Sequence, residues 1–203
     1  MASRAAKIAL GAGYLFAVLV LFQFVSVQVA LSFYQAQARA PQSPPTVRVA
    51  AQAAKGLPTR LKIPSIRVNA VIRSVGLTVD GSMGVPKIPR ETAWYMHGPK
   101  PGEPGSAVIA GHVNWLYGAT AVFARLKSLR PGDIMTVQDD RGLSTSFVVR
   151  ETRIFGPTED ATSVFRSTDG KSHLNLITCG GIWDRVTRMY SKRLVVFADR
   201  VEE

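Results

Sequence analysis

Hydrophobic and polar positions divide the chain into three parts. From Ile8 to Phe33 no residue is charged, and only two glutamines and two serines interrupt the apolar run. Ala40 to Leu57 has three prolines near its start and no apolar period. From Pro58 onward, short runs rich in Val, Ile and aromatic residues alternate with glycine and proline. This pattern predicts a membrane-spanning helix, then a tether, then a β domain.

The long apolar segment favours a retained membrane anchor. As a helix it would run about 39 Å, more than the roughly 30 Å of hydrocarbon in a bilayer. Arg4 and Lys7 stand just before it, which predicts a cytoplasmic N-terminus and an exported remainder. A cleaved signal peptide is the alternative, because residues 36–38 and 38–40 fit a small-residue cleavage pattern. Signal peptides usually have a shorter apolar core of about 7–15 residues.

These boundaries predict the domain organisation. Residues 1–7 form a cytoplasmic N-terminus, 8–33 a transmembrane anchor, 34–57 a Pro/Ala-rich tether, and 58–203 a folded domain. The expected location is the cell membrane, crossed once, with the folded domain on the extracellular side.

The folded domain is predicted to be mainly β. Glycine- and proline-containing turns separate its apolar runs, and eight short strands indicate a sandwich or a closed barrel. The expected strands are Leu61–Ile63, Val68–Ile72, Trp94–Met96, Ala107–His112, Ile134–Gln138, Ser146–Ile154, His173–Cys179 and Leu194–Ala198. One helix is expected over Ala119–Leu129, where apolar residues recur at helical spacing before Pro131-Gly132.

Charge narrows the choice of partner only slightly. The net charge is +11, of which residues 1–57 contribute +5 and the rest +6. A basic surface suits nucleic acid or an anionic envelope polymer equally well. No helix-turn-helix, zinc-finger or aromatic-plus-basic RNA motif accompanies the charge, so a nucleic-acid partner is not expected.

The candidate chemistry centres on Cys179, the only cysteine of the 203 residues. A single cysteine excludes an internal disulfide and a zinc site built on several cysteines. Cys179 ends the alternating run His173–Cys179, and Gly180-Gly181 follow it. Such glycines prolong a strand poorly, so we expect the thiol at a strand end facing a cleft, where it could act as a nucleophile. The alternative is a buried, inert cysteine.

A nucleophilic thiol needs a proton-transfer partner and a charge to stabilise an oxyanion. His112 is the best of three histidines, because it closes an apolar strand directly after a glycine. His173 begins the cysteine's own strand, roughly 20 Å away along an extended chain, and His97 lies in a loop rich in proline and glycine. Arg193 starts the last apolar run, so it is expected at a strand end.

Three motifs in this order carry a family resemblance. GSAVIAGH around His112, LITC around Cys179 and YSKRLVVFA around Arg193 together resemble the sortases, membrane-anchored cysteine transpeptidases of bacterial cell surfaces. TAWYMHGPKPGEPGSAVIAGHV and TCGG look most like the class F group. The family's cysteine motif often reads TLxTC, and Asn175 stands here in place of its first threonine.

The resemblance implies a closed eight-stranded β-barrel with one or two short helices. It implies Cys179 as nucleophile, His112 as acid and base, Arg193 as oxyanion stabiliser and Thr178 as a substrate-binding residue. The expected reaction cleaves an LPxTG-like C-terminal sorting signal through a thioacyl-enzyme and transfers the protein to an amine acceptor, a peptidoglycan precursor or another protein. No metal or organic cofactor is expected.

Two alternatives stay open at this point. Another cell-wall cysteine peptidase is one, although papain-like and NlpC/P60 enzymes place the cysteine before the histidine, and L,D-transpeptidases place a glycine before the thiol. The other is a non-enzymatic, membrane-tethered β-domain that binds envelope polymer through its basic surface.

Overall fold

The computed structural model describes residues 55–187 and 189–202, which belong to one compact unit, Gln52–Glu203. Eight strands carry the fold, and most lie within a few residues of the predicted runs. They are β1 (Pro58–Ile63), β2 (Val68–Val75), β3 (Thr92–Tyr95), β4 (Gly105–Gly111), β5 (Ile134–Asp139), β6 (Ser144–Phe155), β7 (Ser172–Asp184) and β8 (Met189–Arg200).

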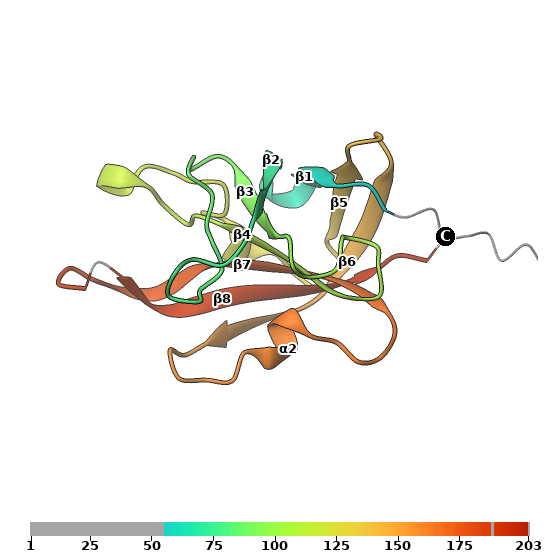
Figure 1. Cartoon of the computed structure of the whole chain (residues 1–203). Helices are drawn as coiled ribbons and strands as arrows, with labels where there is room; N and C mark the ends of the chain where they lie inside the picture. The colour runs from blue at the N-terminus through green and yellow to red at the C-terminus, as the bar shows by residue number, and fades with distance from the viewer. Residues whose placement is uncertain (1–54, 188, 203) are drawn as a thin grey trace, which may run out of the picture. The chain divides into compact units, whose positions relative to one another are not determined.

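The strands close into a barrel in the order β1-β2-β3-β4-β7-β8-β6-β5 (Figure 1). Two neighbouring pairs are parallel, β2 with β3 and β4 with β7, and the other pairs are antiparallel. A closed barrel leaves no open sheet edge, so every strand has two partners. The predicted mainly β, eight-stranded closed barrel is therefore confirmed.

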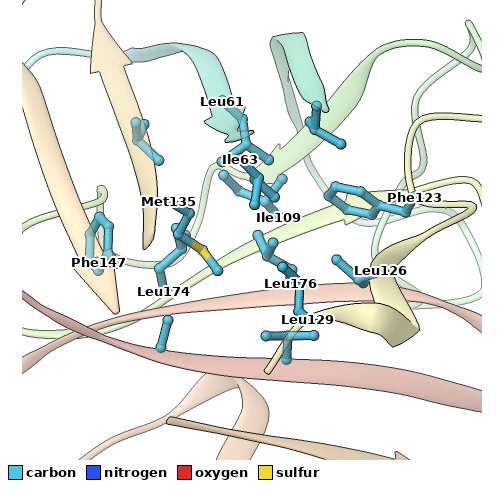
Figure 2. Packing of buried hydrophobic residues seen from close by; sticks show 14 of the residues in the cluster. Leu61, Ile63, Ile109, Phe123, Leu126, Leu129, Met135, Phe147, Leu174 and Leu176 are labelled. Carbon is cyan, nitrogen blue, oxygen red and sulfur yellow. The ribbon is translucent and has the colours of Figure 1, made fainter. Parts of the chain in front are cut away.

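The barrel interior is filled by the alternate residues of each strand. Leu61 and Ile63 of β1 lie across the interior from Leu174 and Leu176 of β7, and Ile109 of β4 lies in the same layer (Figure 2). All five are fully buried. This core lies entirely within residues 61–198, so residues 52–203 are expected to fold without the preceding segments.

A second apolar cluster lies on the outer face of the barrel. It joins Val108 of β4 and Val195 of β8 to Phe155, Phe197 and Val164. Val164 belongs to α2 (Thr162–Phe165), a single helical turn in the connection between β6 and β7. The cluster thus holds the β6–β7 connection against the strands that carry the candidate catalytic residues.

The predicted helix over 119–129 is wrong. Its backbone groups bond to other segments: Val122 N–H donates to the Pro89 carbonyl and Phe123 N–H to the His112 carbonyl. The helical ladder cannot form with those donors engaged elsewhere. Only a 3-10 turn, η3 (Leu126–Ser128), remains there; two others are η1 (Pro64–Ile66) and η2 (Leu116–Gly118).

The glycines after Cys179 do not end β7, contrary to the prediction. Gly181 has φ +79°, and the register with β8 shifts between Gly180 and Trp183. This is a β-bulge, for which glycine is well suited. β7 and β8 then continue as a hairpin that projects from one end of the barrel (Figure 1). Arg193 therefore lies within β8 and not at its start.

The predicted cytoplasmic segment, the anchor over 8–33 and all but the last residues of the tether lie outside the described residues. Within residues 55–187 and 189–202, none of the helices has the length and apolar character needed to span a bilayer.

Candidate active site

Cys179 and Arg193 are direct partners across the antiparallel β7–β8 pair. Residues opposite each other in such a pair project from the same face of the sheet. Leu174 and Leu176 project into the barrel, so alternation along β7 places Cys179 on the outer face. Two residues separated by 14 positions in the sequence thus share one face at one level of the barrel.

His112 joins them from the neighbouring strand. β4 and β7 run parallel with Ala110 opposite Ile177. Two further residues along each chain bring His112 level with Cys179 and on the same face. His112 immediately follows the last residue of β4, Gly111. The strand pairing therefore brings the three predicted catalytic residues to the same end of the barrel, Cys179 on β7, Arg193 on β8 and His112 directly after β4.

Two contacts orient the His112 ring. Its Nε2 lies 2.8 Å from the carbonyl oxygen of Pro86, which can only accept, so Nε2 carries the proton and donates. The Trp115 ring packs edge-on against the imidazole, with centroids 4.9 Å apart. With Nε2 bound to Pro86, Nδ1 is the ring nitrogen left for proton exchange.

The Arg193 guanidinium is turned back on its own strand. Its Nη1 donates to the carbonyls of Tyr190, at 3.1 Å, and Lys192, at 3.0 Å. The side chain is exposed. Among the described residues, the Cys179 thiol has no hydrogen bond to either His112 or Arg193. The site accordingly lacks a preformed thiol–imidazole hydrogen bond.

Thr178 fixes the spacing between the thiol and the imidazole. Its hydroxyl donates a 2.7 Å hydrogen bond to the Gly111 carbonyl, and the side chain is buried. A side chain at Gly111 would meet the Phe123 ring, because an added Cβ would lie 2.5 Å from it. Glycine is therefore needed before His112 for close packing. The predicted substrate-binding role of Thr178 stays a prediction.

A cavity of about 240 Å³ opens beside the thiol. Thr178 and Cys179 line it together with Leu194 of β8, Ile154 of β6 and Lys127 of the β4–β5 connection. The Cys179 side chain is only half-buried. A reactive group on a ligand can therefore reach the sulfur from this side.

A family model described as a sortase domain matches residues 61–201, which is most of the chain. The chain belongs to the sortase family. Sortases are cysteine transpeptidases, and membership of this family argues against the alternative that Cys179 is an inert cysteine. A comparison with curated proteins gave no match.

Solved sortase structures share the fold of this sortase. Sortase C-1 from Actinomyces oris is 24% identical, with a TM-score of 0.57, covering 71% of this chain and 74% of that one. Sortase C1 from Streptococcus agalactiae is 19% identical, with a TM-score of 0.56 and coverage of 71% and 67%. Sortase A from Corynebacterium diphtheriae is 21% identical, with a TM-score of 0.56 and coverage of 75% and 64%.

Asn175 ties the β6–β7 connection of this sortase to β7. Its Nδ2 donates a 2.6 Å hydrogen bond to the carbonyl of Val164 in α2, and the side chain is 1% exposed. Its Oδ1 is buried and has no partner among the described residues. The residue that departs from the TLxTC pattern therefore positions the segment that packs over the outer face.

The other two histidines have structural partners. His173, at the start of β7, lies 2.7 Å from Asp199 and 3.0 Å from Asp169. The pKa of Asp169 is held well below its usual range, mainly by the hydrogen bond from Ser167 and next by the contact with His173. His97 packs edge-on against Tyr95, with centroids 5.6 Å apart.

Sequence reasoning missed the groups that orient the site. The Pro86 carbonyl belongs to the β2–β3 connection, far from His112 in sequence, and no motif indicated it. Trp115 was visible as a neighbour of His112, but its packing was not predicted. Tyr190, whose hydroxyl accepts a 2.7 Å hydrogen bond from Asn114, was likewise not anticipated.

Proposed function

We propose that this sortase is a membrane-anchored transpeptidase that cleaves an LPxTG-like C-terminal sorting signal and joins the protein to an amine on the cell surface. One observation carries the proposal: Cys179 is paired with Arg193 across β7–β8, and β4, the parallel neighbour of β7, ends directly before His112. A nucleophile, a proton carrier and a fixed positive charge are the groups that acyl transfer requires.

The first half-reaction forms the thioacyl-enzyme. The Cys179 thiolate attacks a backbone carbonyl carbon of the signal, and a C–S bond forms. The C–N bond then breaks, and the leaving amine takes a proton from the His112 imidazolium. The second half-reaction reverses these steps with a new amine: His112 accepts its proton, a C–N bond forms, and the C–S bond breaks to restore the thiolate. Water in place of the amine gives slow hydrolysis.

Arg193 stabilises the oxyanion in this scheme. A guanidinium offers a fixed charge and several N–H donors. In the free protein, Nη1 of Arg193 donates to the carbonyls of Tyr190 and Lys192. Exposed side chains change rotamer within nanoseconds, so the guanidinium can leave these carbonyls when a substrate carbonyl arrives on its face.

The location and the subclass belong to the same proposal. The charge-free run over 8–33, preceded by Arg4 and Lys7, supports an anchor with the barrel on the extracellular side. The segment from Thr92 through Val113 and the TCGG motif support class F.

A product assay tests the proposal. Residues 52–203 are incubated with an LPxTG-type peptide and an amine such as triglycine, and the ligated peptide is measured by liquid chromatography and mass spectrometry. We expect a ligated product that needs the amine and disappears in Cys179→Ala. A folded wild-type barrel that yields no product with any peptide of a panel varied at each signal position would contradict the proposal.

A further inference from the structure

The β7–β8 hairpin carries exposed apolar side chains beyond the active site. Ile182 is 80% exposed, Val186 92%, Met189 58% and Trp183 47%. Asp184, the last residue of β7, is five residues beyond Cys179, which corresponds to about 16 Å of extended strand. Trp183 pairs with Tyr190 and Met189 with Asp184, so these side chains project from both faces of the hairpin tip, and the described residues leave them exposed.

The hairpin is braced and not a loose loop. Trp183 pairs with Tyr190 in the register, and their rings pack edge-on with centroids 5.0 Å apart. The Tyr190 hydroxyl accepts a hydrogen bond from Asn114, two residues after His112. Asp184 accepts the backbone N–H of Val186 at 2.7 Å and so shapes the turn. The apolar tip is thus held in a fixed relation to the active site.

The sequence is rich in basic residues around this tip and in the connection that follows His112. Residues 180–193 contain four basic residues and one acid, a net charge of +3: Arg185, Arg188, Lys192 and Arg193 against Asp184. Residues 113–130, which follow His112, contain three basic residues and no acid: Arg125, Lys127 and Arg130. The same connection exposes Leu116, which is 67% exposed. The active-site end therefore combines apolar projections with positive charge.

We propose that this hairpin docks on an anionic phospholipid bilayer, with Ile182, Trp183, Val186 and Met189 entering the interface. Tryptophan and aliphatic residues flanked by Lys and Arg are the composition that partitions into the headgroup region of a bilayer. A soluble anionic polymer would satisfy the charges, but it would leave the four apolar side chains in water. The combination therefore favours lipid over polymer.

Docking would hold the active site at the membrane surface, where it would act on substrates that are themselves bound to the membrane. The inference does not rest on the transpeptidase reaction, because binding is measured without substrate. A failure of lipid binding would leave the proposed chemistry untouched, and the reverse is also true.

The experiment uses residues 52–203, which contain the complete barrel and lack the predicted anchor. The protein is floated with vesicles of phosphatidylglycerol and phosphatidylcholine, or of phosphatidylcholine alone, at low and high salt. We expect flotation with the anionic vesicles that salt weakens, and a blue shift of tryptophan emission that brominated lipid quenches. Trp183→Phe should remove that shift and quenching.

Matched variants separate insertion from charge attraction. Ile182→Asp with Val186→Asp should lower partitioning at least about tenfold, whereas Val79→Asp with Leu143→Asp, at exposed apolar sites of other loops, should not. Arg185→Gln with Lys192→Gln should weaken binding to anionic vesicles. Thermal unfolding checks that each variant is folded. Absence of flotation at low salt would overturn the proposal. Binding that needs the basic pair but not the apolar pair would overturn it too, and would indicate an anionic-polymer surface.

Discussion

The hydroxyl of Thr178 donates to the carbonyl of Gly111 at 2.7 Å, joining the residue before the thiol to the residue before the imidazole. β4 and β7 are parallel neighbours, and their last register pair, Ala110 with Ile177, lies two residues before His112 and Cys179. The buried hydrogen bond from Thr178 to Gly111 adds a further constraint at the end of β4, where the backbone leaves the sheet. The distance between nucleophile and proton carrier is thereby fixed by strand pairing and not by a direct bond between them.

Replacing Thr178 with valine should both slow catalysis and destabilise the fold. The substitution keeps the shape and removes the donor, so we expect a loss of about 1–3 kcal/mol in the free energy of unfolding. Small displacements of reacting groups are costly, so kcat should fall roughly 10- to 100-fold. Thr92→Val is the matched control, because the buried Thr92 hydroxyl donates to Val71 on β2. Equal kcat losses in the two variants would contradict a specific role of the Thr178 hydrogen bond in positioning the active site.

Arg193 should matter for the transition state and little for the fold. Its side chain is exposed and, among the described residues, bonds to carbonyls of β8. We expect Arg193→Ala to lower kcat roughly 100- to 1,000-fold, with partial recovery in Arg193→Lys, which keeps the charge but loses the planar fork. Steady-state kinetics and thermal unfolding measure both effects. Lys192→Ala, one residue away, is the control, and an equal loss there would remove Arg193 from the proposed role.

Asn175 should affect substrate binding through α2. Without its amide, the Val164 carbonyl loses its 2.6 Å partner in a buried setting, so Asn175→Ala should cost about 1–3 kcal/mol in the free energy of unfolding. The loosened β6–β7 connection should raise KM more than it lowers kcat. Asn175→Thr introduces the threonine of the TLxTC pattern, and it tests whether a shorter hydroxyl can donate to the Val164 carbonyl in place of the amide. An unchanged KM in Asn175→Ala would show that α2 does not contribute to the substrate site.

Acid should destabilise the fold partly through Asp169. Its pKa is lowered by the Ser167 hydroxyl, by His173 and by the Lys171 backbone N–H. A carboxylate with a lowered folded-state pKa stabilises the fold above its unfolded pKa of about 4, and this stabilisation is lost as pH falls through the folded value. Between about pH 5 and about pH 3, the midpoint of thermal unfolding should therefore drop less in Asp169→Asn than in the wild type. Glu202→Gln near the C-terminus is the control and should follow the wild type; identical pH profiles for wild type and Asp169→Asn would refute the effect.

The strands of the barrel could be predicted because each is a short apolar run between turn residues. The helix over 119–129 could not be excluded, because its apolar spacing fits a helix. What overrides that spacing is a pair of tertiary hydrogen bonds, from Val122 to Pro89 and from Phe123 to His112, which no local pattern contains. The length of β7 was misjudged for a similar reason. Its pairing with β8 resumes beyond the bulge at Gly181, and the partner strand decides whether a glycine ends a strand.

The motifs indicate which residues are candidates for the site, whereas they do not indicate what surrounds those residues. His112, Cys179 and Arg193 each adjoin an apolar run, so the order of β4, β7 and β8 brings them to one end of the barrel. The Pro86 carbonyl that orients His112 and the Val164 carbonyl that receives Asn175 are backbone groups of connecting segments. Backbone acceptors leave no mark in a sequence, since every residue has one.

The most direct test of the central claim is intact-protein mass spectrometry of residues 52–203 after mixing with LPxTG-type peptides, followed by peptide mapping. The account predicts an added acyl fragment on Cys179, released by neutral hydroxylamine, absent in Cys179→Ala and formed more slowly in His112→Ala and Arg193→Ala. A folded protein whose thiol reacts with iodoacetamide but acquires no acyl fragment from any peptide of the panel would contradict it.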